Sequence, residues 1–200
     1  MKRAEQGSGL IVIILVIAFL LAVGVVLVTV TSTGPRVSGN VRNQEEAFNA
    51  AEAGFDASRI EMESLLSSGT WSNFDGHYLV EPAGIDLPTI ASASNPLYFR
   101  SLTDEELLGL IDTNDDGIAD VSNIIFCQQP FTTTQLGADD LRYTYTTFLI
   151  DDEAGGGTYD PSDVLLVTIG IVRAGAAGTR VLATSRLEIV LAIQQIGTSP

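Results

Sequence analysis

The sequence contains almost none of the residues that build catalytic or disulfide-stabilised sites. It has one histidine and one cysteine among 200 residues, and no HExxH, Gly-x-Ser-x-Gly or phosphate-binding glycine motif. Cys127 is alone, which excludes an intramolecular disulfide. Its apolar neighbours favour a buried residue over a thiol that joins two subunits. His77 lies in a segment typical of a loop or strand rather than of a catalytic base. We therefore predict that the chain is not an enzyme.

Positive charge is also scarce. Ten Lys and Arg residues stand against 25 Asp and Glu, which gives a formal net charge of −15. Arg142 is the only cationic residue between Ser101 and Gly170. Such a chain repels the phosphate backbone, so we exclude nucleic acid as a partner. The acidic balance suits either a solvated surface or cation binding.

Only the start of the chain has a long hydrophobic run. Leu10–Val30 carries no charge and is long enough to cross a hydrocarbon core of about 30 Å. The apolar stretch of a secretory signal is shorter, about 7–15 residues. Lys2 and Arg3 precede the run, so the positive-inside tendency predicts a cytoplasmic N-terminus with the bulk of the chain outside. A single-pass anchor and a membrane-extracted filament subunit both fit these features.

The segment after this run has the pattern of an amphipathic helix. Gly34-Pro35 separates the two, and we expect a break or kink there because proline removes a helix hydrogen bond and restricts the residue before it. The predicted divisions are a hydrophobic helix over 8–33, an amphipathic helix over 34–68 and a head over 69–200. In the amphipathic segment, apolar residues recur at three- and four-residue steps, namely Phe48, Ala51, Phe55, Met62 and Leu65.

Three features in order resemble the type IV pilin-like proteins, and within them the PilX-type minor pilins. A basic leader ends in Gln6-Gly7, a hydrophobic helix opens with Ser8-Gly9-Leu10-Ile11-Val12, and the segment from Asn40 to Ala53 follows. The resemblance covers about the first third of the chain. It implies that prepilin peptidase removes a leader over 1–7 by cutting between Gly7 and Ser8, with cleavage after Gly9 as the alternative.

The resemblance also implies partners and a location. The expected partners are other pilin subunits, bound through the N-terminal helix, and prepilin peptidase, with a tip adhesin as a further candidate. The chain would be held in the inner membrane before assembly and would then enter an extracellular filament. Retractile pili, a secretion pseudopilus and a DNA-uptake filament all remain open.

One departure from the major pilins is informative. Major pilins carry a glutamate five residues into the mature chain, which is thought to pair with the N-terminal amine of a neighbouring subunit. Counted from Ser8, that position is Val12. PilX-type and tip pseudopilins also lack this glutamate. A buried charge in lipid is costly without its partner, so Val12 favours a minor, priming or tip-proximal subunit.

An acidic segment has the spacing of a calcium loop. Thr103-Asp104-Glu105-Glu106 predicts a helix N-terminus, and the short helix leads into a loop over 112–123. Oxygen side chains fall at loop positions 1, 3, 5 and 9, with glycine at position 6. Position 12 is Asn123 instead of the bidentate glutamate, so we expect a weak Ca²⁺ site, or an acidic turn that binds nothing. The candidate ligands are Asp112, Asn114, Asp116, Ile118, Asp120 and Asn123.

From Leu141 onward the pattern changes to the alternation of β-strands. Strands are predicted over 142–150, 163–173 and 179–193, separated by glycine-rich turns. The last strand should place Val181, Ala183, Leu187, Ile189, Leu191 and Ile193 on one face. One-faced alternation predicts an antiparallel sheet with one side covered by the amphipathic helix. The expected fold class is therefore α+β and pilin-like.

Two functions follow from the sequence. The first is a PilX-like minor pilin for assembly, priming or the tip of a type IV pilus or related filament, with a calcium-stabilised extracellular head. The second is a single-pass anchored surface protein that binds calcium or a partner through its acidic loops and never enters a filament.

Overall fold

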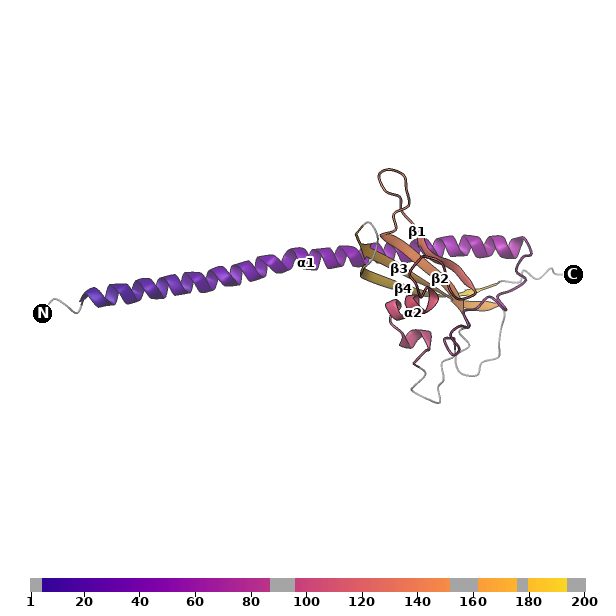
Figure 1. The fold of residues 1–200 in the computed structure, drawn as a ribbon, viewed down its shortest axis with the longest axis horizontal. Helices are drawn as coiled ribbons and strands as arrows, with labels where there is room; N and C mark the ends of the chain where they lie inside the picture. The colour runs from indigo at the N-terminus through magenta and orange to yellow at the C-terminus, as the bar shows by residue number, and fades with distance from the viewer. Residues whose placement is uncertain (1–4, 87–95, 152–161, 176–179, 194–200) are drawn as a thin grey trace. The chain divides into compact units, whose positions relative to one another are not determined.

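The computed structural model describes residues 5–86, 96–151, 162–175 and 180–193. Two compact units divide the chain, Met1–Arg42 and Asn43–Pro200. The helices and strands of the described residues (Figure 1) are α1 (Glu5–Ser67), the 3₁₀ helix η1 (Phe99–Ser101), α2 (Asp104–Ile111), β1 (Ile124–Pro130), β2 (Tyr143–Ile150), β3 (Asp163–Ala174) and β4 (Arg180–Ala192).

The helix α1 continues through Gly34-Pro35, so the break predicted there is absent. Proline removes one hydrogen bond from the helical ladder. Such a residue can kink a helix without ending it. The boundary between the two units falls later, between Arg42 and Asn43.

The second unit is built on a four-stranded antiparallel sheet with the strand order β1-β2-β3-β4. β2 and β3 pair without interruption from Tyr143↔Val172 to Ile150↔Leu165. The three strands predicted after Leu141 are confirmed. The sequence analysis missed β1, whose pairing with β2 has two register shifts and which contains Gln128 at a φ of 43°.

One face of the sheet packs on residues 43–67 of α1 through unusually small side chains. Ala47, Ala50 and Ala51 are fully buried, and a Cβ atom at Gly170 would overlap the Ala47 carbonyl oxygen. A Cβ at Gly54 would lie 2.6 Å from Thr168 Cγ2. The small residues of α1 recur every three or four positions, at Ala47, Ala50 or Ala51, and Gly54. The helix therefore presents its narrowest side to β2 and β3.

The opposite face is covered as well, which corrects the prediction of a sheet with one covered side. α2 contributes Leu107, Leu108 and Ile111 to a core cluster with residues of β2 and β3. Arg186 of β4 holds the start of α2, since its guanidinium lies 2.7 Å from Asp104 Oδ1 and donates to the carbonyl of Phe99. β3 is therefore buried on both faces, while β4 at the sheet edge is not.

The predicted face of β4 is correct except for Val181. Leu191 and Ile193 pack in the cluster beneath α1, and this cluster also includes Met62. Val181 packs instead against the cluster on the α2 side. A register shift between Val172 and Arg173 leaves one extra residue in β4. That bulge reverses the alternation at the start of the strand.

Candidate functional site

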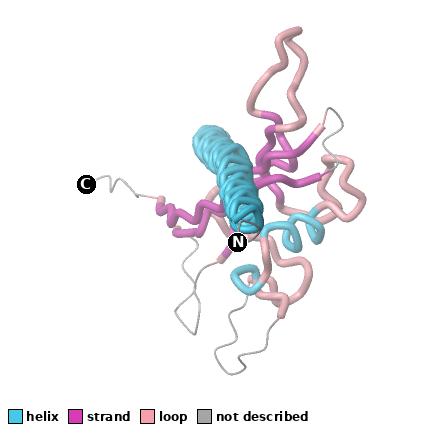
Figure 2. Tube along the Cα trace, turned by 90° about the vertical axis from the view of Figure 1, so that its left-hand side faces the viewer, coloured by secondary structure: helices cyan, strands magenta, loops and turns pink. Residues whose placement is uncertain are grey.

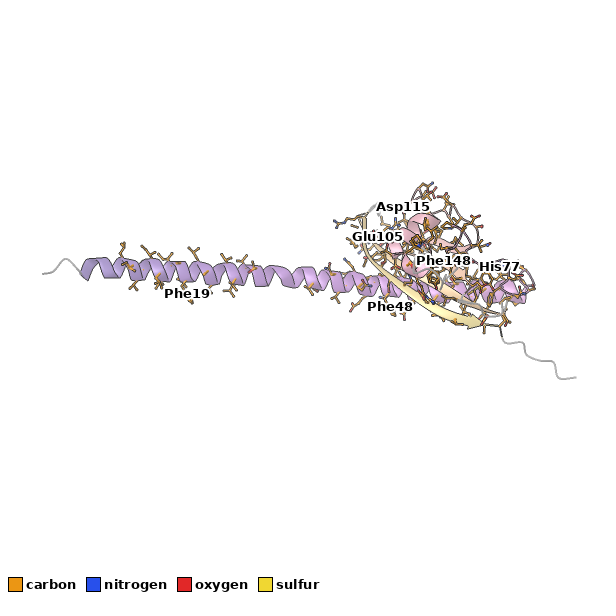
Figure 3. All side chains as sticks on the ribbon, turned by 90° about the horizontal axis from the view of Figure 1, so that it is seen from below. Phe19, Phe48, His77, Glu105, Asp115 and Phe148 are labelled. Carbon is orange, nitrogen blue, oxygen red and sulfur yellow. The ribbon has the colours of Figure 1, made fainter. Side chains whose placement is uncertain are left out.

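The apolar part of α1, Gly9–Thr29, is long and apolar enough to cross a membrane, and none of it is buried inside the protein. Phe19, labelled in Figure 3, is 65% exposed, and Val12 is 58% exposed. The hydroxyl of Thr29 donates to the carbonyls of Val25 and Val26. Even the polar group at the end of this segment is thus satisfied by the helix itself, as lipid surroundings require.

The predicted processing site lies at the start of this helix. Gly7 and Ser8 fall inside α1, and so does Gly9, the alternative cleavage position. A Cβ atom added at Gly9 or Gly24 would meet nothing within 4 Å among the described residues.

The start of the acidic loop is held by the capped helix before it. The hydroxyl of Thr103 accepts from the backbone N–H of Glu106, and the Glu106 carboxylate accepts from the Thr103 backbone N–H at 2.8 Å. These hydrogen bonds lower the pKa of Glu106. The predicted cap is confirmed. α2 ends at Ile111 and Asp112 is its C-cap, with its backbone N–H donating to the Leu108 carbonyl, so loop position 1 directly follows the helix.

The side-chain oxygens of the loop accept hydrogen bonds from the loop's own backbone N–H groups. Asp112 Oδ2 accepts from the N–H of Gly117 at 2.8 Å, while Asp112 Oδ1 accepts from the N–H of Asp116 at 3.2 Å. Asn114 Oδ1 accepts from the same Asp116 N–H at 3.2 Å. Gly117 has a φ of 83°, a conformation that favours glycine. Three of the predicted ligand residues, Asp112, Asn114 and Asp116, thus meet around one short turn.

Two other predicted ligands are held elsewhere. Asp120 accepts hydrogen bonds from the backbone N–H and the hydroxyl of Thr113, and these bonds lower its pKa. Asn123 donates from its side-chain amide to the carbonyl of Tyr78 at 2.9 Å. Ile118 is exposed, and its backbone N–H donates to Asp116 Oδ1. Its carbonyl is the atom that the sequence predicts as a ligand.

Two residues outside the loop hold it against the sheet, and the sequence analysis missed both. Gln128 of β1 donates to Asp112 Oδ2 at 2.7 Å and to Asp115 Oδ1 at 2.8 Å. Arg173 of β3 pairs with Asp115 at 2.9 Å. Burial raises the pKa of Asp115, but the hydrogen bonds from Gln128 and Arg173 outweigh this and leave the pKa below its usual value. The one feature of the sequence that could have indicated these contacts is Arg173, a cation in a largely apolar strand.

Cys127 lies beside the loop on β1 and is half-buried. Burial raises its pKa to about 12, and the charges of Asp112 and Asp116 add to the effect. A raised pKa disfavours the thiolate, which is the nucleophilic form of cysteine. This agrees with the prediction that Cys127 is a packing residue.

The donor chemistry of the loop suits calcium, which prefers carboxylate, amide and backbone carbonyl oxygens. The carboxylates are not gathered, however. Among the described residues, no group of three or more His, Cys, Asp or Glu side chains is placed to hold a metal ion. Asp112 and Asp116 share the turn with the amide of Asn114, and Asp120 faces Thr113. The arrangement is thus a closed acidic turn with two carboxylates and one amide at its centre.

Comparison with known proteins bears on the N-terminal part of the chain. Residues 6–56 match the family model described as PilX N-terminal. The matched region contains the apolar segment and the part of α1 that carries Ala47, Ala50, Ala51 and Gly54. No curated protein and no solved structure matches the chain. The comparison therefore shows that residues 6–56 are similar to the N-terminal region of PilX-type type IV pilins.

Proposed function

We propose that this chain is a minor pilin, assembled into a type IV pilus or a related filament through the apolar segment of α1. The single observation that carries the proposal is the PilX N-terminal match over residues 6–56. It coincides with a helix that is apolar over Gly9–Thr29. Before assembly this helix anchors the chain in the inner membrane, and afterwards it packs among the helices of other subunits.

Val12 supports a minor rather than a major subunit. It stands where major pilins carry a glutamate, and as an uncharged residue it crosses or leaves the membrane without a buried charge to neutralise. A priming or tip-proximal position follows, because a subunit with no subunit above it has no N-terminal amine to pair with. Restoring the charge with Val12→Glu should alter incorporation or filament number and leave the stability of the head unchanged.

Cleavage by prepilin peptidase tests the proposal most directly. The full chain is incubated with the peptidase in membranes, and the mature N-terminus is determined by mass spectrometry. We expect a chain beginning at Ser8. Gly7→Leu should block the reaction, whereas the matched variant Gly9→Leu should be cut normally if the bond is Gly7–Ser8. An intact Met1, or a cut on the outer side near Gly34, would rule out a pilin and favour the single-pass surface protein.

We further propose that calcium stabilises the head through the loop over 112–123. Asp112, Asn114 and Asp116 would supply three of the oxygens, and their support is that Asp112 and Asn114 both accept hydrogen bonds from the backbone of the turn at Asp116 and Gly117. The carbonyl of Ile118 and the side chains of Asp120 and Asn123 complete the proposed ligand set. An ion here would relieve the repulsion between the Asp112 and Asp116 carboxylates. Extracellular calcium at millimolar concentration suits a loop without the bidentate glutamate.

Thermal unfolding with calcium and with chelator tests this site. A ligand that binds only the folded state at ten times its Kd adds about 1.4 kcal/mol, which corresponds to a rise in Tm of roughly 3–6 °C for a chain of this size. Asp112→Ala should abolish the rise. Glu105→Gln removes one acidic charge from α2 without removing a loop oxygen, and it should keep the rise. An equal rise in wild type and Asp112→Ala would eliminate the site.

A further inference from the structure

A small pocket lies between the C-terminal end of α1 and the start of β1, and its volume is about 170 Å³. Residues 43–67 of α1 lie beside the strands, as Figure 2 shows with the helix nearly end-on. After α1 the chain turns back toward the sheet (Figure 1) and supplies two aromatic residues to the pocket. We call it the Trp71 pocket, and its lining residues are Glu61, Leu65, Trp71, His77, Asn123, Ile124 and Ile125.

The aromatic wall of the Trp71 pocket is held in place by stacking and by backbone hydrogen bonds. The rings of Trp71 and His77 lie parallel, with 4.0 Å between their centroids and 14° between their planes. The backbone N–H of Trp71 donates to the Leu65 carbonyl at 3.0 Å, and that of His77 donates to the Phe74 carbonyl at 3.1 Å. The pocket is therefore formed before any ligand enters, which reduces the entropy lost on binding.

Glu61 is the only acidic side chain that lines the pocket. It is exposed, and it forms no ion pair within the described part of the chain. Arg59, on the same helix, is paired with Glu63 at 2.7 Å. Burial lowers the pKa of His77 and outweighs the opposite effect of Asp75, which favours the neutral imidazole at neutral pH. The pocket therefore combines a carboxylate with a neutral aromatic wall.

These groups suit a side chain with an apolar stem and a cationic end. Leu65, Ile124 and Ile125 offer apolar surface for the stem, and Glu61 offers a carboxylate for the charge. Arginine fits better than lysine, because its guanidinium is planar, is less strongly hydrated and both stacks on aromatic rings and pairs with carboxylates. Sites for small-molecule ligands usually measure about 300–1,000 Å³. A pocket of about 170 Å³ is suited instead to a single side chain.

Residues 43–200 have no arginine or lysine of their own for this pocket. They contain six arginines and no lysine, and the segments 87–95, 152–161, 176–179 and 194–200 contain neither. Arg180 pairs with Ala174 at the end of the sheet opposite to Ile124. Each of the other five forms an ion pair within the head, namely Arg59 with Glu63, Arg100 with Glu188, Arg142 with Asp140, Arg173 with Asp115 and Arg186 with Asp104.

We propose that the Trp71 pocket binds an arginine side chain of another protein. The stem of that arginine packs on Leu65, Ile124 and Ile125, and its guanidinium pairs with Glu61 beside the Trp71–His77 stack. The excess of acidic residues, with a formal net charge of −15, also attracts a basic partner surface to the head. The inference goes beyond the proposed function and does not rest on leader cleavage, filament assembly or calcium.

Titration with a short peptide tests the pocket directly. The chain has one tryptophan, so its indole N–H gives a single signal in a proton–nitrogen NMR spectrum, and that signal reports on the pocket. The full chain in detergent, with a calcium chelator present, is titrated with acetyl-Gly-Arg-Gly-amide, whose only charge is the guanidinium. We expect a saturable shift of the signal. The peptide with citrulline, a neutral residue of the same shape, should bind about fivefold more weakly or less.

Two variants on the same helix separate pairing with Glu61 from general attraction to an acidic head. Glu61→Gln should raise the Kd of the arginine peptide about fivefold, the upper range for an exposed ion pair. Glu63→Gln makes the same change of charge two residues away, outside the lining of the pocket, and should leave the Kd unchanged. Both residues are exposed, so both variants should fold, and the wild-type position of the indole signal without peptide checks this.

Three outcomes would overturn the proposal. Equal binding of the arginine and citrulline peptides would assign the pocket to a neutral polar ligand. Equal weakening by Glu61→Gln and Glu63→Gln would show that the peptide is attracted by the head as a whole. An indole signal that does not move with the arginine peptide would show that the pocket receives no such side chain.

Discussion

The two halves of the continuous helix α1 differ in the size and in the burial of their side chains. Residues 9–29 expose large apolar side chains all round, and none of them is buried among the described residues. Residues 43–67 instead bury a stripe of the smallest side chains, Ala47, Ala51, Gly54 and Ser58, against the sheet. Large side chains on every face suit an apolar solvent, whereas small ones let a helix approach a neighbouring backbone closely. The same residue type should therefore respond differently to substitution in the two halves.

Gly170→Ala, in β3, should cause the largest loss of stability, because it disrupts the packing of residues 43–67, the docked half of α1. A Cβ atom there would overlap the backbone carbonyl oxygen of Ala47, and backbone cannot rotate away as a side chain can. Overpacking of a core costs about 1–3 kcal/mol and occasionally more, and we expect about 3 kcal/mol or more here. The measurement is thermal unfolding of the full chain in detergent, followed by the fluorescence of Trp71, the only tryptophan. A loss below about 1 kcal/mol would show that α1 does not approach β3 this closely.

The pair Gly54→Ala and Gly24→Ala makes the same change in each half. At Gly54 the new methyl group would meet side-chain atoms of Thr168 and Tyr145 at 2.6–2.8 Å, which can shift at some cost. We expect a loss of about 1–3 kcal/mol. At Gly24 nothing lies within 4 Å, so the head should unfold at the wild-type temperature. Equal effects of the two substitutions would contradict the different packing of the two halves.

The sequence predicts those parts of the fold that depend on local pattern. The cap of α2 at Thr103 and the strands β2, β3 and β4 follow from residues within a few positions of one another. β1 was missed because its alternation is interrupted by two register shifts and by Gln128 at positive φ. The second covered face was missed because α2 and β3 are far apart in sequence. The alternation of side chains along one strand does not predict how many faces of the sheet are covered by other elements.

The acidic loop shows the same limit at the candidate site. The spacing of Asp112, Asn114 and Asp116 predicts oxygens directed into one turn, and in the structure the side-chain oxygens of Asp112 and Asn114 both accept from the backbone N–H of Asp116. The contacts that hold the loop to the sheet come from Gln128, 16 residues from Asp112, and from Arg173, 58 residues from Asp115. Such contacts depend on which strands become neighbours, so a motif can indicate the ligands of a site without indicating its supports.

Ser58→Ala and Thr29→Val compare the hydroxyl groups of the two halves. Ser58 Oγ donates to Thr147 Oγ1 at 2.8 Å in a fully buried setting. Removing it leaves the Thr147 hydroxyl without this partner, and we expect a loss of about 1–3 kcal/mol. The Thr29 hydroxyl donates to the backbone carbonyls of Val25 and Val26 in its own helix, so its replacement should leave the unfolding of the head unchanged. Addition of Thr147→Val to Ser58→Ala should cost less than the sum of the two single changes.

The smallest effect is expected at Arg59 and Glu63, on the solvent side of the docked half. The two side chains are 49% and 64% exposed, and an exposed pair four residues apart on a helix contributes about 0.3–0.5 kcal/mol. Glu63→Gln should therefore lower Tm only slightly, and added salt should remove even that difference because it screens exposed charges. A loss above about 1 kcal/mol would show that the pair contributes more than an exposed ion pair on a helix can. A small, salt-sensitive loss would instead show that the stability of this half comes from the buried stripe on its other side and not from its solvent-facing charges.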